Sequence, residues 1–176
     1  MSLRRPRHGS GRRRRYTARD PAVTSRIMSA VRDRDSGAEV LLRRVLWRRG
    51  LRYRLRPRHV ADQVVPGRPD IVFVKARVIT FVDGDFWHGR VLLERGLEAL
   101  ASQFRPALRR WWLAKIGGNV ARDRRVAAGL RARGWMVLRF WESTVFRSVE
   151  RVADTVERAV RRRLRRQLSA GRRSSL

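Results

Sequence analysis

The sequence predicts a single α/β domain, and three observations lead to this fold class. Apolar residues recur with helical spacing in four stretches, and four other short stretches alternate or are rich in β-branched and aromatic residues. Glycine and proline residues separate these stretches. The chain has 176 residues, of which 43% are hydrophobic, which suffices for one domain with a substantial core. The predicted order of elements is α-α-β-β-β-α-β-α.

The first half of the chain contains two predicted helices and three predicted strands. A short helix is expected at residues 24–31, and a clearer one at 38–49, ended by Gly50. Alternation of apolar residues and arginine over 51–55 predicts a half-buried strand. The runs 71–74 and 78–82 are separated by three residues and predict a hairpin.

The second half begins with residues 83–108, which lack sustained periodicity and are expected to form a loop that carries the site. Within this region, 91–100 could form a short helix. A long helical pattern covers 109–133, and its two adjacent glycines, Gly117 and Gly118, predict a bend or a break. Residues 135–141 predict the last strand, and 145–168 predict an arginine-coated C-terminal helix.

The two ends of the chain differ in composition from the middle. Residues 1–20 consist mostly of Arg, Pro, Gly and Ser, so they are predicted to be a disordered basic arm. We expect the folded domain to span 21–145 and a basic helix and tail to span 146–176. Lysine and arginine number 44 against 15 acidic residues, and the resulting charge of +29 at pH 7 predicts a nucleic acid as the partner.

Composition also excludes several classes of protein and site. The chain has no cysteine, and its three histidines are dispersed, so disulfides, thiolate sites and structural zinc are not expected. No segment approaches 18 uninterrupted apolar residues, and the N-terminus has no apolar signal region. We therefore expect neither secretion nor membrane insertion, but work in the compartment that holds DNA.

Four acidic residues are placed where they could support the hydrolysis of a phosphodiester. This chemistry needs a divalent metal, which prefers carboxylate and carbonyl oxygens, and a base that activates water. Asp70 begins one strand of the predicted hairpin, whereas Asp83 and Asp85 follow the other, so the hairpin brings them together. Glu39 lies near the apolar face of an early helix, and His88 follows Asp85 closely.

Each of these residues also has an ordinary explanation. Asp70 could cap the turn that precedes it, Asp83 with Gly84 could form a tight turn, and His88 could be a loop histidine. Their joint placement around one hairpin favours a site over these three separate explanations.

Longer motifs add a resemblance to a known family. Pro69-Asp70 followed by a hairpin matches the first half of the PD-(D/E)xK nuclease pattern. The run at 81–89, Phe-Val-Asp-Gly-Asp-Phe-Trp-His-Gly, closely resembles the hallmark of the very short patch repair (Vsr) endonucleases. Further similar segments lie at 25–30, 112–123 and 134–142, so the resemblance extends from about residue 17 to 142. It implies a restriction-endonuclease-like core, with a central mixed sheet flanked by helices.

The resemblance also implies roles for the candidate site residues. Asp70 would bind a catalytic Mg²⁺, and the Val82 carbonyl would be a second ligand, with Asp83 beside it as a third candidate. His88 would be the general base, since an imidazole can accept a proton at neutral pH. Glu39 would be a supporting acid near the metal-bound water.

A second set of residues is expected to contact DNA. By the resemblance, Phe86 and Trp87 together with Met28 would wedge between base pairs beside a mismatch. Lys115 and Asn119 lie one helical turn apart and could face the same groove. The alternatives are a loop anchored on the core and a solvated helix surface, respectively. The predicted DNA-binding residues are Met28, Phe86, Trp87, Lys115, Asn119 and Arg122.

The chain departs from the family at one place. Many Vsr endonucleases hold the loop with a zinc ion bound by cysteines and a histidine. The matching places here are Asp85, Arg90, about Leu92, and Ser143. We expect no zinc, and we expect Asp85 and Arg90 to pair across the loop in its place.

The implied function is a Mg²⁺-dependent DNA endonuclease of very short patch mismatch repair. It would nick double-stranded DNA beside a T:G mismatch, leaving a 5′-phosphate and a 3′-hydroxyl. It would act as a monomer in the bacterial cytoplasm, associated with the nucleoid, and other mismatch-repair proteins are further candidate partners. Two alternatives are a restriction-type or junction nuclease with the same core, and a basic nucleic-acid-binding protein without catalysis. The arginine-rich ends alone support the last.

Overall fold

The computed structural model describes residues 36–60 and 63–173. The predicted basic arm, the predicted helix at 24–31 and the proposed wedge residue Met28 lie outside these residues. The described elements are α2 (Gly37–Arg48), β1 (His59–Val60), β2 (Gln63–Val64), β3 (Ile71–Phe73), β4 (Val78–Asp83), α3 (Arg90–Ala101), α4 (Pro106–Ala132), β5 (Met136–Trp141) and α5 (Glu142–Arg173).

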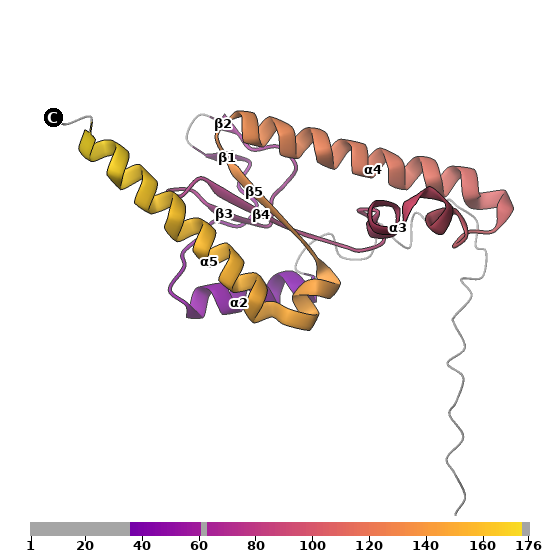
Figure 1. The fold of residues 1–176 in the computed structure, drawn as a ribbon, viewed down its shortest axis with the longest axis horizontal. Helices are drawn as coiled ribbons and strands as arrows, with labels where there is room; N and C mark the ends of the chain where they lie inside the picture. The colour runs from indigo at the N-terminus through magenta and orange to yellow at the C-terminus, as the bar shows by residue number, and fades with distance from the viewer. Residues whose placement is uncertain (1–35, 61–62, 174–176) are drawn as a thin grey trace, which may run out of the picture. The chain divides into compact units, whose positions relative to one another are not determined.

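A mixed three-stranded sheet lies at the centre of this region, with β4 in the middle (Figure 1). β3 and β4 form the predicted antiparallel hairpin, in which Ile71 is opposite Thr80. β5 pairs with β4 in parallel, and Val82 is opposite Phe140. The predicted α/β fold with a central mixed sheet is confirmed.

The prediction of a strand at 51–55 is wrong. Only Arg54 pairs with the sheet, through an isolated antiparallel bridge to Val72. The ring of Tyr53 packs edge-on against Phe73 and Trp47. The alternation therefore reflects the packing of Leu51 and Tyr53 against the first core, and β3, which has three residues, is too short to support a longer ladder.

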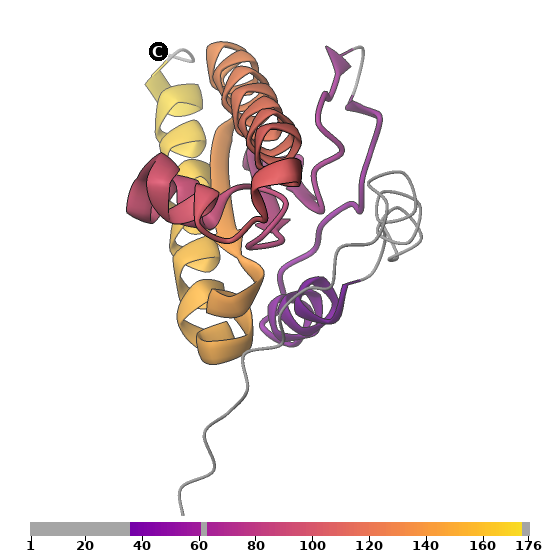
Figure 2. The same ribbon diagram turned by 90° about the vertical axis from the view of Figure 1, so that its right-hand side faces the viewer.

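Helices cover both faces of the sheet (Figures 1 and 2). One face packs against α2 and α5, and the other packs against α4. The first core contains Leu42, Leu46, Ile71, Phe73, Val78, Val152 and Val156, among others. The second contains Val72, Ile79, Phe81, Ala127, Leu130 and Val137, among others. Two-sided burial explains why all three residues of β3 are buried.

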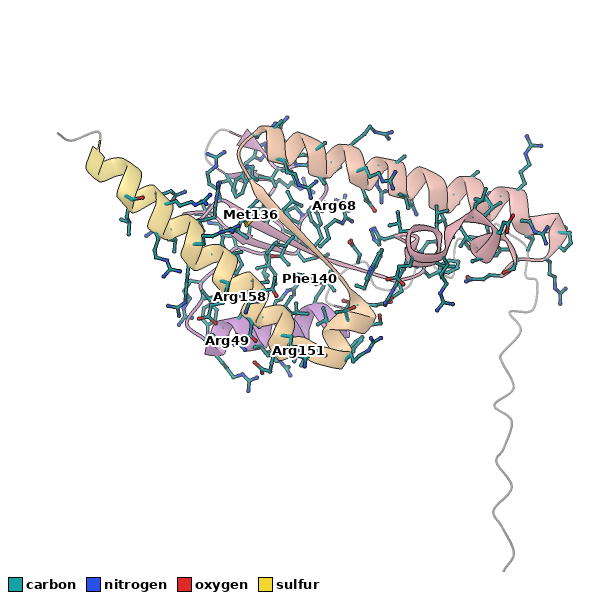
Figure 3. All side chains as sticks on the ribbon, viewed as in Figure 1. Arg49, Arg68, Met136, Phe140, Arg151 and Arg158 are labelled. Carbon is teal, nitrogen blue, oxygen red and sulfur yellow. The ribbon has the colours of Figure 1, made fainter. Side chains whose placement is uncertain are left out.

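Arg49 connects α2 to α5 (Figure 3). Its guanidinium group contacts the carboxylates of Glu150, Asp154 and Glu157, all on α5. α5 begins at Glu142, slightly before the predicted start, and Val145, Val152, Val156 and Val160 lie in the first core. The C-terminal helix is thus part of the packed structure.

The predicted bend or break at Gly117-Gly118 is wrong, because α4 continues through both glycines. Each glycine in a helix interior costs roughly 1 kcal/mol relative to alanine. Ile116 and Val120 on either side are buried, and the helix also packs through Ala127 and Leu130. Tertiary packing along the whole helix outweighs this local cost.

The expected short helix after the loop is confirmed as α3, which has a kink at Gly96, where φ is +86°. α3 and the first half of α4 enclose a third cluster, which includes Leu100, Trp112 and Ile116. None of the helices within the described ranges is long and apolar enough to cross a membrane.

Candidate active site

Asp70 lies immediately before β3, at the edge of the first core. Its backbone N–H donates to the Thr80 carbonyl, which extends the hairpin by one bond of 3.1 Å. Its Oδ2 accepts a hydrogen bond from the Val82 N–H at 2.8 Å. The residue is 7% exposed. The hairpin therefore holds the Asp70 carboxylate against the backbone of β4 at Val82, the residue whose carbonyl was predicted as a ligand.

Glu39 approaches Asp70 from the first turn of α2. Ser36 is the N-cap of this helix, and its Oγ accepts a hydrogen bond from the Glu39 N–H. The Glu39 carboxylate is buried and pairs with Arg43 and Arg56. The Arg56 Nη2 atom lies 2.8 Å from Oε2 of Glu39 and 3.2 Å from Oδ1 of Asp70. Both predicted acids thus converge on one cationic nitrogen.

The electrostatic surroundings of Asp70 and Glu39 favour a bound cation. Burial raises the pKa of Asp70 to about 6, and the negative charge of Glu39 adds to the rise. The Val82 N–H and the charges of Arg56 and Arg43 act in the opposite direction but do not cancel it. A cation next to Asp70 would therefore stabilise its ionised form.

The donor set fits a hard divalent ion. Two carboxylates that share one cationic partner are oxygen donors aimed at the same point, which suits Mg²⁺. Within the described residues, no group of three or more His, Cys, Asp or Glu side chains gathers as a metal site. An ion here would therefore take its remaining ligands from backbone carbonyls such as that of Val82 and from water.

His88 belongs to the loop between β4 and α3. Its N–H donates to the Gly84 carbonyl, which closes a tight turn. The next residue, Gly89, has φ of +71°, and a Cβ there would lie 2.7 Å from Val120 and 2.9 Å from Ile116 on α4. Only glycine permits this close approach and this conformation together. The glycine thus presses the loop, and His88 with it, against α4.

His88 pairs with an acid that the sequence analysis did not assign. Its Nδ1 lies 2.5 Å from Oδ2 of Asp123, on α4. Burial acts to raise the pKa of Asp123, but His88 and Arg139 outweigh it and hold that pKa below its usual value. The ionised Asp123 fixes the orientation of the imidazole ring. A signal existed, because Asp123 lies three residues after Val120 and four before Ala127, on the buried stripe of the helix.

Asp83 binds Arg139 and lies beside His88. Both of its carboxylate oxygens accept hydrogen bonds from Arg139 at 2.6 Å, and its Oδ1 is 3.5 Å from Nδ1 of His88. Its predicted role as a metal ligand would require it to give up this bidentate pair. Arg139 was not singled out from the sequence, since one arginine among so many carries no signal.

A cavity of about 360 Å³ opens beside His88. Its polar lining is formed by Asp83, His88, Asp123, Arg124, Arg131 and Arg139. The histidine thus borders a space in which Arg139 pairs with both aspartates, whereas Arg124 and Arg131 add positive charge that would attract a phosphate group.

The comparisons with known proteins agree on one family. The family of the DNA mismatch endonuclease Vsr matches residues 17–93. A type II nicking enzyme of Neisseria meningitidis serogroup C is 35% identical over 141 residues, which are 80% of this chain and 88% of that enzyme. The DNA mismatch endonuclease Vsr of Escherichia coli K12 is 37% identical over 135 residues, 77% of this chain and 78% of that protein. The chain belongs to the Vsr family.

A further relative, a type II nicking enzyme of Lentzea aerocolonigenes, is 37% identical over 150 residues, 85% of this chain and 84% of that enzyme. As a Vsr family member, the protein is a DNA endonuclease of mismatch repair, and DNA is its partner. The mixed sheet flanked by helices is the restriction-endonuclease-like core of that family.

In this Vsr family member, Phe86 and Trp87 are half-buried in an aromatic cluster. The Phe86 ring packs edge-on against Trp87 and Trp112, at centroid distances of 5.1 Å and 5.2 Å. The amide of Asn119 donates to the Trp87 carbonyl at 3.0 Å, so Asn119 supports the loop. Lys115 is exposed on the same helix.

Arg122, the last predicted DNA contact, is exposed on α4 next to Asp123. Its Nη2 lies 3.5 Å from Oδ1 of that aspartate, and its side chain is 58% exposed. The head group of Arg122 is therefore accessible beside the His88 pair.

The loop of this Vsr family member is tied to α5 by polar groups. Arg90 Nη1 donates to Oδ1 of Asp85 at 2.6 Å, so the predicted pair is confirmed. Ser143, at the start of α5, donates to Asp85 through its hydroxyl at 2.7 Å and through its backbone N–H at 3.1 Å. Three of the four places that match the zinc ligands of the family thus form one cluster, which we call the Asp85 clamp (Asp85, Arg90 and Ser143).

Proposed function

We propose that this protein nicks duplex DNA beside a T:G mismatch in a Mg²⁺-dependent reaction. The observation that carries the proposal is that a pair of acids suited to bind a metal and a histidine suited to act as a base both lie near one end of β4. The buried carboxylates of Asp70 and Glu39 converge on one cationic nitrogen, and His88, in the loop that follows β4, pairs with Asp123 of α4.

The Asp70 carboxylate, the Val82 carbonyl and the Glu39 carboxylate are the proposed metal-binding groups, either directly or through water. Nucleases of this kind generally use a divalent metal, and these all-oxygen donors favour Mg²⁺ over softer ions. When bound, Mg²⁺ would polarise the scissile phosphate and neutralise charge that develops on the leaving oxygen. Asp83 is a further proposed ligand, and both of its carboxylate oxygens also accept hydrogen bonds from Arg139.

His88 is the proposed general base. Asp123 contacts Nδ1, which leaves Nε2 to accept a proton from the attacking water. The water oxygen then bonds to phosphorus, the bond from phosphorus to the 3′-oxygen breaks, and that oxygen takes up a proton. The products are a 5′-phosphate and a 3′-hydroxyl. Arg124 and Arg131, which line the cavity beside His88, are placed to attract the phosphates of the substrate strand.

Preference for T:G is proposed to come from Phe86, Trp87 and Met28. A mismatched step is already poorly stacked, so inserting aromatic rings costs less there than in matched duplex. Insertion requires Phe86 and Trp87 to exchange contacts with Trp112 for contacts with bases. Lys115, Asn119 and Arg122 are the proposed groove and backbone contacts; Asn119 would need to contact DNA while it holds Trp87.

The test is the cleavage of three labelled duplexes side by side: matched, T:G and junction-containing, with Mg²⁺ and with EDTA. Nicking of the T:G duplex alone, only with Mg²⁺, supports the proposal. Preferential cleavage of the matched or junction duplex would assign a restriction-type or junction activity. Binding without cleavage of any duplex would leave a non-catalytic protein. Light scattering at assay concentration tests the expected monomer.

A further inference from the structure

Arg56 lies between the two carboxylates of the proposed metal site. Its Nη2 is 2.8 Å and 3.0 Å from the two oxygens of Glu39 and 3.2 Å from Oδ1 of Asp70. The side chains of Glu39 and Asp70 are only 8% and 10% exposed. We propose that Arg56 occupies the position of the divalent cation and competes with it, so that metal binding requires Arg56 to leave. The inference rests on the proposed function, since it takes Asp70 and Glu39 as metal-binding groups.

Competition follows from charge and from geometry. A guanidinium group and a divalent ion carry like charges, which repel strongly at a few ångströms in a partly buried site. Mg²⁺ also draws its oxygen ligands to about 2.1 Å, a space that leaves no room for a nitrogen between the same two carboxylates. Arg56 and the ion therefore exclude each other.

Arg43 and Arg56 both contact Glu39, but their backbone settings differ. Arg43 is on α2, one turn after Glu39, and its side chain is 10% exposed, so the helix holds it in place. Arg56 follows the isolated bridge at Arg54, outside the described helices and strands. Its φ is +43°, a left-handed conformation that a non-glycine residue keeps only when its surroundings enforce it.

The competition should make the metal affinity of the wild-type protein weaker than that of a variant without the Arg56 charge. When only a fraction of molecules is competent to bind, the apparent dissociation constant rises by the inverse of that fraction. If Arg56 bridges the acids about nine-tenths of the time, the apparent affinity is about tenfold weaker than that of the open site. Removing the charge of Arg56 should therefore increase the apparent metal affinity by about tenfold.

The experiment is a calorimetric titration of Mn²⁺ alone into the full chain, without DNA, at constant pH and ionic strength. Arg56→Gln should bind Mn²⁺ about tenfold more tightly than wild type. Arg54→Gln is the matched control. Arg54 is exposed and lies two residues before Arg56, so this substitution removes the same charge outside the proposed site. It should bind as wild type does. Arg56→Lys keeps the charge and should fall between wild type and Arg56→Gln.

Unchanged or weaker Mn²⁺ binding by Arg56→Gln would overturn the inference. An equal gain in affinity in Arg54→Gln would also overturn it, because the gain would then come from the lower net charge of the protein. If Arg56→Gln does not fold, a crystal of the wild-type chain soaked in Mn²⁺ decides. A guanidinium group withdrawn from Asp70 supports competition, whereas one still between Asp70 and Glu39 beside a bound ion contradicts it.

Asp70→Asn in the same titration separates this inference from the proposed function. If Asp70→Asn binds Mn²⁺ as wild type does, the metal assignment itself is wrong, and both fail. If Asp70→Asn loses binding while Arg56→Gln is unchanged, only the competition fails.

Discussion

Asp70 and Asp85 both contact an arginine at the same end of the sheet, but the pKa values of their carboxyl groups shift in opposite directions. Asp70 is 7% exposed, and burial raises its pKa to about 6. Burial also acts to raise the pKa of Asp85, but hydrogen bonds from Arg90 and Ser143 outweigh it and hold that pKa below its usual value.

The difference lies in how many donors each carboxylate receives. Asp85 accepts from Arg90 and twice from Ser143, so its charge is satisfied within the clamp. Asp70 accepts one backbone N–H and shares the guanidinium group of Arg56 with a second buried acid. A carboxylate with several donors stabilises a loop, whereas a buried carboxylate beside a second acid is suited to attract a metal ion.

Substitution of Asp70 should have the largest effect on cleavage, and comparison with Asp85 should separate the two roles. Asp70→Ala should lose all detectable cleavage, because the proposed metal site loses its central ligand. DNA binding should remain near wild type, since phosphate contacts of a +29 chain supply most of the affinity. Asp85→Ala, the matched control, should still cleave. Nicking assays beside filter binding measure both, and wild-type cleavage by Asp70→Ala would end this assignment of the metal site.

The His88–Asp123 pair should give the next largest effect. His88→Ala should slow cleavage by about 10²- to 10⁴-fold, as expected for a positioned base. Asp123→Asn should cost less, about 10- to 100-fold, because it acts through the orientation of His88. Single-turnover rates test this order. A larger loss in Asp123→Asn than in His88→Ala would argue that the aspartate itself touches the metal or substrate.

Trp87 tests whether the clamped loop serves recognition as well as support. Trp87→Ala should reduce cleavage of T:G duplex by more than tenfold, while binding to matched duplex, which depends on phosphates, changes little. Trp47→Ala is the control, because Trp47 is 53% exposed on α2 and outside the aromatic cluster. If Trp87→Ala unfolds the protein or weakens matched and mismatched binding equally, Trp87 is a core anchor.

The raised pKa of Asp70 predicts a dependence of stability on pH in the absence of metal. The folded state binds the Asp70 proton more tightly than the unfolded chain, whose usual pKa is 3.8. Stability should therefore rise as pH falls from about 6 to about 4. In EDTA at pH 7.5, Asp70→Asn should be more stable than wild type by on the order of 2 to 3 kcal/mol.

Urea unfolding, followed by tryptophan fluorescence at several pH values, measures this difference. The gain in Asp70→Asn should vanish below about pH 4, where the wild-type carboxyl is protonated in both states. A variant less stable than wild type at pH 7.5 would show that the Asp70 charge is already compensated, and the contrast with Asp85 would disappear.

The clamp should give the smallest effect on the whole protein. Arg90→Ala leaves Asp85 with the two Ser143 donors, so global unfolding should change little, because surface ion pairs contribute weakly. Hydrogen exchange of loop amides at 84–89 should nevertheless accelerate several-fold. Elemental analysis should find no stoichiometric zinc, since the chain has no cysteine. Stoichiometric zinc, or unchanged exchange in Arg90→Ala, would contradict the clamp.

The sequence by itself determined the order of the main elements and the short-range parts of the site. Periodicity located α2, the β3–β4 hairpin, α4 and β5 because each is defined by residues close together in the chain. Asp70 and the loop with Asp85, His88 and Arg90 were found for the same reason. Asp85 and Arg90 are five residues apart, so one loop can pair them.

Only the tertiary structure decided which distant charges meet. His88 and Asp123 are 35 residues apart, and Asp83 and Arg139 are 56 apart. Their contacts depend on β5 pairing with β4 and on α4 packing beside them, which no local pattern encodes. In a chain with 44 basic residues, Arg56 is one arginine among many. It acquires its role only because the fold buries Glu39 and Asp70 together, and two buried carboxylates require a cation between them.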